Sequence, residues 1–153
     1  MNARPRSGSV VSRDDLQRLR MALGRVSRVL RQQSDDELSY ALTSLLFTIG
    51  RTEPATATEL AETEKVTPPS VSRSLSRLEA LHLIERNPDP TDGRVTRIRL
   101  TDLGRKEREN ILRSREEWLT ERLRLLSPDQ RSELLLALPA LERLCDPYEA
   151  EVS

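Results

Sequence analysis

Residues 67–100 constrain the fold more than any other part of this 153-residue chain, because they combine a helix that has a sharp start with a short ribbon. Thr67 suits the N-cap position, and Pro68 suits the first helical position, where a missing N–H costs nothing. At about 100° per residue, one face of this helix is apolar and consists of Val71, Leu75 and Leu78. The opposite face carries Pro69, Ser70, Arg73, Ser76, Arg77 and Ala80.

This second face is small, hydroxylic and basic, and no carboxylate occurs in the helix before Glu79. Short side chains let a helix backbone approach the floor of a DNA major groove, where Arg73 and Arg77 could contact guanine edges or phosphates. On composition alone, an ordinary solvated arginine face is the simpler explanation. The residues that follow the helix favour a DNA-binding helix over a solvated arginine face.

Residues 83–86 and 95–100 have the composition of short strands, and the second run alternates apolar with cationic side chains. The Asn-Pro-Asp-Pro sequence of residues 87–90 excludes a helix, and Asp92-Gly93 supplies a hairpin turn with Arg94 beside it. Taken alone, Asp92-Gly93 would fit any surface hairpin. The order helix, ribbon and tip arginine predicts a winged helix-turn-helix, in which the arginine reaches the minor groove while the helix occupies the major groove.

Two shorter helices are predicted just before this stretch. The first covers residues 39–51 and ends at Glu53-Pro54; its apolar positions are Leu42, Leu45, Leu46 and Ile49. The second covers residues 57–64, and Thr56 and Glu59 form a T-x-x-E capping box at its start, with Leu60 and Ala61 facing inward. A helix, a short turn and a cationic second helix are typical of the helix-turn-helix.

The terminal regions predict further helices that are rich in leucine. Ser12 and Asp15 resemble a capping box that opens a helix through about residue 33, with an apolar stripe at spacings of three and four formed by Leu16, Leu19, Leu23, Val26 and Leu30. A long helix is expected at residues 102–126. A last helix follows, which an S-x-x-Q capping box of Ser127 and Gln130 opens and Pro139 kinks. These helices expose more leucine than the winged module can cover, so we expect a homodimer, which would present two reading helices to a pseudo-palindromic site.

The fold class is therefore mainly α with a small β-ribbon. We expect a disordered arm at residues 1–11, a winged helix-turn-helix DNA-binding domain at residues 39–105, and a helical dimerisation region at residues 12–38 and 106–150. Net charge is zero, but residues 65–106 hold nine basic against five acidic side chains, and residues from 107 onward hold seven against eleven. This asymmetry is expected of a basic DNA-binding lobe on a neutral scaffold.

Other classes find little support. No run approaches a membrane span and the amino end lacks a signal peptide, so we expect a cytoplasmic protein with no membrane partner. One cysteine, Cys145, and one histidine, His82, exclude a disulfide framework and a zinc cluster. No nucleotide-binding or hydrolase motif is present. We therefore predict a protein with no cofactor, no bound metal and no enzymatic activity.

The chain from about residue 42 to residue 105 resembles the MarR family of bacterial transcriptional regulators. The matching parts are LTSLLFTIGR, TELAE, VTPPSVSRSLSRLEALHLIER and DPTDGRVTRIRLTDLGR. The resemblance implies a dimer with interlocked terminal helices, Arg94 in the minor groove, Asp92 orienting the wing through ion pairs, and repression relieved by a small, often aromatic effector. The residues predicted to bind double-stranded DNA are Thr67, Pro69, Ser70, Ser72, Arg73, Ser76, Arg77, Asp92, Arg94 and Arg97.

The chain departs from the family pattern in two places. His82 stands where members usually have glycine, which implies a strained helix cap or a different helix end. The amino end lacks the sensor cysteine of oxidant-responsive relatives, and Cys145 is more simply a small hydrophobe than a thiol switch.

A candidate effector site would involve Tyr40, Phe47 or Trp118, although each also fits an ordinary core position. The alternative functions are a winged-helix module for protein contact and an architectural DNA binder without sequence preference. A ratio of specific to non-specific affinity of about 10³ or more would separate a regulator from both.

Overall fold

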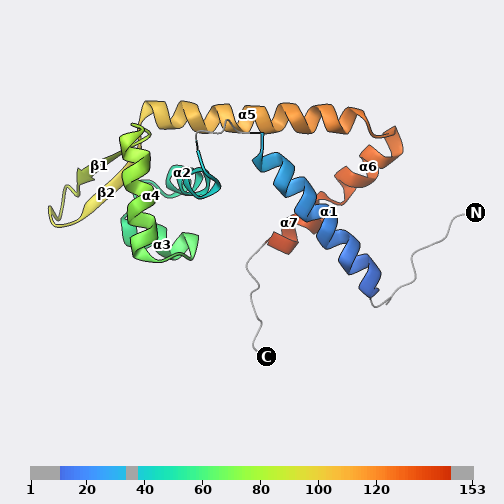
Figure 1. Ribbon diagram of the computed structural model, residues 1–153, viewed down its shortest axis with the longest axis horizontal. Helices are drawn as coiled ribbons and strands as arrows, with labels where there is room; N and C mark the ends of the chain where they lie inside the picture. The colour runs from blue at the N-terminus through green and yellow to red at the C-terminus, as the bar shows by residue number, and fades with distance from the viewer. Residues whose placement is uncertain (1–10, 34–37, 146–153) are drawn as a thin grey trace, which may run out of the picture. The chain divides into compact units, whose positions relative to one another are not determined.

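The computed structural model describes residues 11–33 and 38–145, which fold into helices and one two-stranded antiparallel sheet (Figure 1). The predicted arm at residues 1–11 lies outside this part of the chain except for Val11, as do residues 34–37 and 146–150 of the predicted dimerisation region. By packing, the chain divides into two units, Met1–Arg115 and Glu116–Ser153. Within the described residues, no helix combines the length and apolar character required to cross a membrane.

Three helices of the first unit pack on one another: α2 (Tyr40–Thr52), α3 (Ala57–Glu64) and α4 (Pro68–Ala80). The predicted apolar positions of all three are buried, and Leu46, Ile49, Leu60, Leu75 and Leu78 are completely inaccessible to solvent. The helix-turn-helix predicted from the apolar spacing is thus confirmed. The core holds α4 by its apolar face, so its polar face points to solvent.

The wing consists of β1 (Ile84–Pro88) and β2 (Thr96–Leu100) in antiparallel register, with Ile84 opposite Leu100 and Pro88 opposite Thr96. The first strand runs two residues beyond the predicted 83–86, because a proline is tolerated on an edge strand. Ala55, between α2 and α3, exchanges two backbone hydrogen bonds with Ile98 of β2, at N–O distances of 3.2 and 2.8 Å. The sheet is therefore anchored to the helices at β2.

Helix starts follow the predicted caps, with two corrections. Two of the three predicted capping boxes form, at Thr56 with Glu59 and at Ser127 with Gln130. At the third, the Ser12 side chain accepts the N–H of Asp15, but the Asp15 carboxylate accepts the Ser12 hydroxyl and not the Ser12 N–H. Thr67 occupies the N-cap of α4 in extended geometry, but its side chain accepts no backbone hydrogen bond; its hydroxyl lies 3.0 Å from that of Ser70. The prolines at the first two helical positions have no N–H to offer, and the Ser70 N–H already donates to the Thr67 carbonyl.

The carboxyl end of α4 depends on a left-handed residue. His82 has φ of 57°, and the N–H of Leu83 donates to the Leu78 carbonyl at 3.0 Å while the N–H of His82 donates to that of Glu79 at 2.9 Å. These two bonds define a Schellman motif with histidine at the position that glycine normally occupies. The first of the two predicted alternatives, a strained cap, is therefore the one that forms.

Substitution of His82 should measure that strain. His82→Gly should raise the free energy of unfolding by about 0.5–1 kcal/mol, because glycine enters the left-handed region without a Cβ clash. His82→Val should lower it, because a β-branched side chain is least tolerated there. Urea unfolding of both variants beside the wild type provides the measurement. Equal stability of the glycine variant and the wild type would mean that the backbone at this position carries no strain.

The long helix α5 (Asp102–Arg124) begins against the lobe. Thr101 donates its hydroxyl hydrogen to the His82 carbonyl at 2.6 Å and accepts from the N–H of Gly104 at 3.0 Å. Glu53, at the end of α2, accepts the N–H of Leu100 at 2.8 Å and pairs with Arg105. Burial alone would raise the pKa of Glu53, but the hydrogen bonds from Arg105 and Leu100 outweigh it and lower the pKa below its ordinary value.

The remaining helices carry exposed apolar side chains. The α1 helix (Arg13–Arg31) has no buried residue, and the predicted stripe of Leu16, Leu19, Leu23 and Val26 is 44–55% exposed. In the second unit, α6 (Pro128–Leu136) and α7 (Leu138–Cys145) are separate helices, so the single kinked helix predicted there is wrong. Pro139 lies in the first turn of α7; it has no N–H for the Leu135 carbonyl and its ring would clash with that group, which ends α6.

Candidate nucleic-acid interface

The α4 helix presents most of its predicted reading residues to solvent. Val71, Leu75 and Leu78 are buried, and Ser70 is half-buried at the edge of the core. The exposed positions are Thr67, Pro69, Ser72, Arg73, Ser76 and Arg77. The hydroxyl of Ser76 donates to the Ser72 carbonyl at 3.0 Å, as expected for a serine inside a helix.

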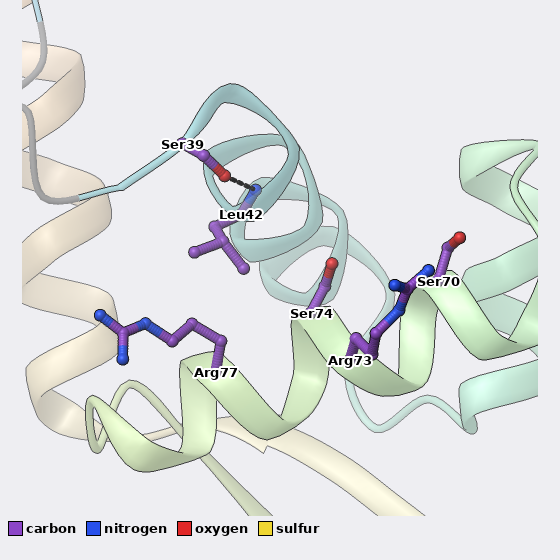
Figure 2. Close-up of a pocket in the computed structure, with 6 residues that line it drawn as sticks. All are labelled: Ser39, Leu42, Ser70, Arg73, Ser74 and Arg77. Atoms are coloured by element: carbon purple, nitrogen blue, oxygen red, sulfur yellow. Dashed lines mark hydrogen bonds between the residues drawn. The ribbon is translucent and has the colours of Figure 1, made fainter.

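The side chains of Arg73 and Arg77 make no hydrogen bond or ion pair with any residue in the described parts of the chain. Both belong to a recess of about 360 Å³ between α4 and the start of α2, whose lining residues are Ser39, Leu42, Ser70, Arg73, Ser74 and Arg77. Figure 2 shows how these side chains lie around the recess. Two cations and three hydroxyls line it without a carboxylate, a composition that suits an anionic group.

The wing tip carries Arg94, which is exposed and whose guanidinium makes no hydrogen bond or ion pair with the described residues. Its backbone N–H donates to Oδ1 of Asp92 at 3.1 Å. This turn hydrogen bond is the only one that the Asp92 side chain makes to the described residues, and it makes no ion pair with them. The expectation that Asp92 orients the wing through ion pairs is therefore corrected.

The carboxylate that organises the wing is Asp89, which was not among the predicted site residues. Its Oδ1 accepts from the N–H of Thr91 at 2.8 Å, the hydroxyl of Thr91 at 2.6 Å and the N–H of Asp92 at 3.2 Å. These hydrogen bonds from Thr91, followed by one from Arg97, hold the pKa of Asp89 far below its ordinary value. An aspartate whose side chain bonds the N–H two residues on is an Asx turn, and the sequence Asp-Pro-Thr-Asp was the available signal.

Arg97 was predicted to bind DNA, and the structure places its guanidinium against two carboxylates. Its Nε donates to Oδ2 of Asp89 at 2.6 Å, and its Nη1 lies 3.6 Å from Oε2 of Glu59. Glu59 is the capping-box residue of α3. Arg97 thus connects the wing loop to the first helix of the helix-turn-helix.

Two of the three candidate effector residues belong to the first unit. Tyr40 lines a second recess of about 410 Å³ between α2, α3 and α4, and the guanidinium carbon of Arg31 lies 5.0 Å from its ring centre. Phe47 contacts Arg108 and Arg115 of α5, whose guanidinium carbons lie 5.5 and 5.4 Å from the ring centre.

Burial, and then the nearby charge of Arg31, lower the pKa of Arg115. Trp118 belongs to the second unit, where Arg122 lies over its ring at 5.6 Å.

A helix-turn-helix with a buried apolar face, an exposed basic reading helix and a two-stranded wing defines the winged helix-turn-helix class of DNA-binding proteins. Comparison with known proteins narrows the class. The model of the MarR family matches residues 38–96. The chain is 33% identical over 129 residues to ML2140, an HTH-type transcriptional regulator of Mycobacterium leprae, covering 84% of this chain and 90% of that protein. The chain belongs to the MarR family.

Solved structures agree with this assignment. A transcriptional regulator of Pseudomonas aeruginosa superposes with a TM-score of 0.80 at 30% identity, over 90% of this chain and all of that one. FabT of Streptococcus pneumoniae, solved in complex with DNA, superposes with a TM-score of 0.67 at 22% identity, over 85% of this chain and 96% of that one. The chain is thus a DNA-binding transcriptional regulator of the MarR family.

Proposed function

We propose that the chain acts as a cytoplasmic, non-enzymatic, homodimeric repressor that recognises a pseudo-palindromic operator. The observation that carries the proposal is the polar face of α4, where Arg73 and Arg77 have no protein partner in the described residues and face solvent beside small hydroxylic side chains. Such a face fits the major groove, where guanidinium groups pair with guanine edges and with phosphates. Arg94 at the wing tip would enter the adjacent minor groove, where a narrow groove attracts arginine.

The contacts proposed for double-stranded DNA divide into three kinds. Arg73 reads a base edge; Arg77 and the hydroxyls at the start of α4 bind phosphates; and the wing supplies Arg94. The residues of α4 and its N-cap proposed to lie against the DNA are Thr67, Pro69, Ser70, Ser72, Arg73, Ser76 and Arg77. Asp92 shapes the turn that carries Arg94.

The exposed leucines support a dimer. The α1 stripe is apolar at four successive positions and lies open to solvent, and α6 and α7 expose Leu134, Leu135, Leu138 and Leu144. Apolar surface of this extent is costly in water, and a second copy of the chain would cover it at both ends of the sequence. A twofold dimer also brings two α4 helices to half-sites about one helical turn apart.

The test is selection of bound duplexes from a random DNA library by the purified protein at about 150 mM salt. Enrichment of an inverted repeat with half-sites about one helical turn apart would support the proposal. If a folded dimer enriches no sequence, a protein-contact module or a non-specific architectural DNA binder becomes the better explanation. Repression, which the family resemblance implied, is then tested with a reporter gene placed behind the selected operator.

Arg94→Ala should weaken operator binding at least about tenfold while the dimer stays intact, because one guanidinium contact to DNA contributes about 1–3 kcal/mol. Fluorescence anisotropy with a labelled operator gives the affinity, and sedimentation gives the oligomeric state. Lys106→Ala, which removes one positive charge from the exposed start of α5, is the control. Equal affinities for the wild type and the alanine variant at residue 94 would remove the wing from the mechanism.

We further propose that a small aromatic anion relieves repression by binding near Tyr40 and Phe47. Phe47 offers an aromatic face, and Arg108 and Arg115 offer cations whose Nε atoms are buried without a hydrogen-bond partner. An acidic aromatic ligand would satisfy both groups. Compounds that release the labelled operator from the wild type but not from a Phe47→Ala variant would support this site.

A further inference from the structure

The wing loop, residues 89–95, closes around the side chain of Asp89. At its base, the N–H of Asp89 donates to the Val95 carbonyl at 2.8 Å, and the N–H of Val95 donates to the Asp92 carbonyl at 2.9 Å. Inside the loop, Oδ1 of Asp89 accepts three hydrogen bonds, all from Thr91 and Asp92. The Asp89 carboxylate therefore holds the loop that carries Arg94, while the Asp92 carboxylate accepts the N–H of Arg94 itself.

The other oxygen of this carboxylate ties the loop to the helices. Oδ2 accepts from Nε of Arg97 at 2.6 Å, and the Asp89 side chain is only 10% exposed. Arg97 is 31% exposed and also reaches Glu59, whose Oε2 accepts the N–H of Thr56 at 2.7 Å in the capping box of α3. A continuous set of polar contacts thus runs from the start of α3 to the wing loop, and α3 in turn packs on α4.

We propose that Asp89 and Arg97 form a positioning pair, which holds Arg94 at a fixed place relative to the reading helix so that both enter their grooves together. This role rests on the proposed function, in which α4 and Arg94 bind one DNA site. Arg97 then acts through Arg94 and does not itself bind DNA. An arginine held in place before binding loses less conformational freedom when the complex forms.

The direction in which DNA affinity changes when the Asp89 charge is removed distinguishes a positioning role from a purely electrostatic one. Asp89 is a negative group on a wing that approaches phosphates, so by charge alone its removal would tighten DNA binding. If Asp89 positions Arg94, its removal weakens binding. Asp89→Asn keeps an oxygen for the N–H groups of Thr91 and Asp92, but sets an NH₂ donor against the Nε donor of Arg97.

The matched control is Glu85→Gln, which removes the same charge from an exposed position on β1 of the same wing. With the selected operator, Asp89→Asn should bind about tenfold more weakly than the wild type, while Glu85→Gln binds equally well or more tightly. In an Arg94→Ala background, Asp89→Asn should have no further effect, because the group it positions is gone. Equal or tighter binding by Asp89→Asn, or additive losses in the double variant, would overturn the proposal.

A second measurement needs no DNA. Trypsin cleaves after Arg94 only when the loop opens locally, so the rate of that cut, followed by mass spectrometry on the full chain, reports the order of the wing. Asp89→Asn and Arg97→Gln should each raise this rate about fivefold, whereas Glu85→Gln leaves it unchanged. An unchanged rate in both variants would show that the pair does not order the loop. If the wild type selects no DNA sequence while the cleavage rates change as expected, the proposed function fails and the ordering of the wing stands.

Discussion

Gly104→Ala is expected to destabilise the winged lobe by at least about 3 kcal/mol. A Cβ atom at this position would lie 2.0 Å from the carbonyl oxygen of Leu83 and 3.0 Å from its carbonyl carbon. Both are backbone atoms, and the same carbonyl accepts the N–H of Thr101 at 3.1 Å. Neither side can yield without moving α5 away from the residues that end α4, so the clash cannot be relieved by a side-chain rotation.

Thermal unfolding followed by circular dichroism should show the melting temperature of Gly104→Ala lowered by at least about 10 °C, given the usual shift of several degrees per kcal/mol in a lobe of this size. Gly24→Ala is the matched control, since a Cβ at Gly24 in α1 would meet no atom within 4 Å. In a helix the added methyl group should leave stability unchanged or raise it slightly. Equal melting temperatures for the wild type and the alanine variant at residue 104 would contradict the close approach of α5 to Leu83.

Arg73→Ala is expected to cause the largest loss of DNA affinity. A guanidinium that reads a base contributes about 1–3 kcal/mol, and in the proposed homodimer every substitution removes two such contacts. Operator affinity should therefore fall about thirtyfold or more. Because the contact is to a base, the loss should also relax the sequence preference at one position in each half-site.

Repeating the duplex selection with this variant tests both expectations. Arg113→Ala, which removes an exposed arginine from α5 that donates to Asn110, controls for the change in net charge. Loss of affinity that is equal for all sequences would reassign Arg73 to a phosphate contact. Preference lost at one position in each half-site, beside an unaffected control, would establish Arg73 as a reading residue.

Local rules predicted the lobe because each depends on a few neighbouring residues. Apolar spacing placed Val71, Leu75 and Leu78 on the buried face of α4, and side-chain chemistry placed the capping boxes at Thr56 and Ser127. The wing followed from alternation in residues 96–100 and from the turn at Asp92-Gly93. These features need no knowledge of distant partners.

The surprises in the wing have a different physical origin, because each depends on which competing partner takes a hydrogen bond. Asp92 and Asp89 have the same chemistry, and only the folded loop reveals that Asp89 faces Arg97 and the N–H groups of the turn. Similarly, the sequence places Arg97 on a cationic strand face and gives no sign that the folded chain brings Glu59 of α3 to it. The predicted contact of Arg97 with DNA stays a prediction. Contacts between segments this far apart in sequence leave no local pattern.

The two hydrogen bonds between Ala55 and Ile98 also bear on solubility. They satisfy the outer side of β2 at its centre, so this strand offers no free edge there to another chain. The other edge belongs to β1, whose solvent-facing Glu85 and terminal Pro88 disfavour pairing with a further strand. Because both edges of the sheet are protected, we expect the wing not to pair with the wing of a neighbouring molecule, even at high protein concentration.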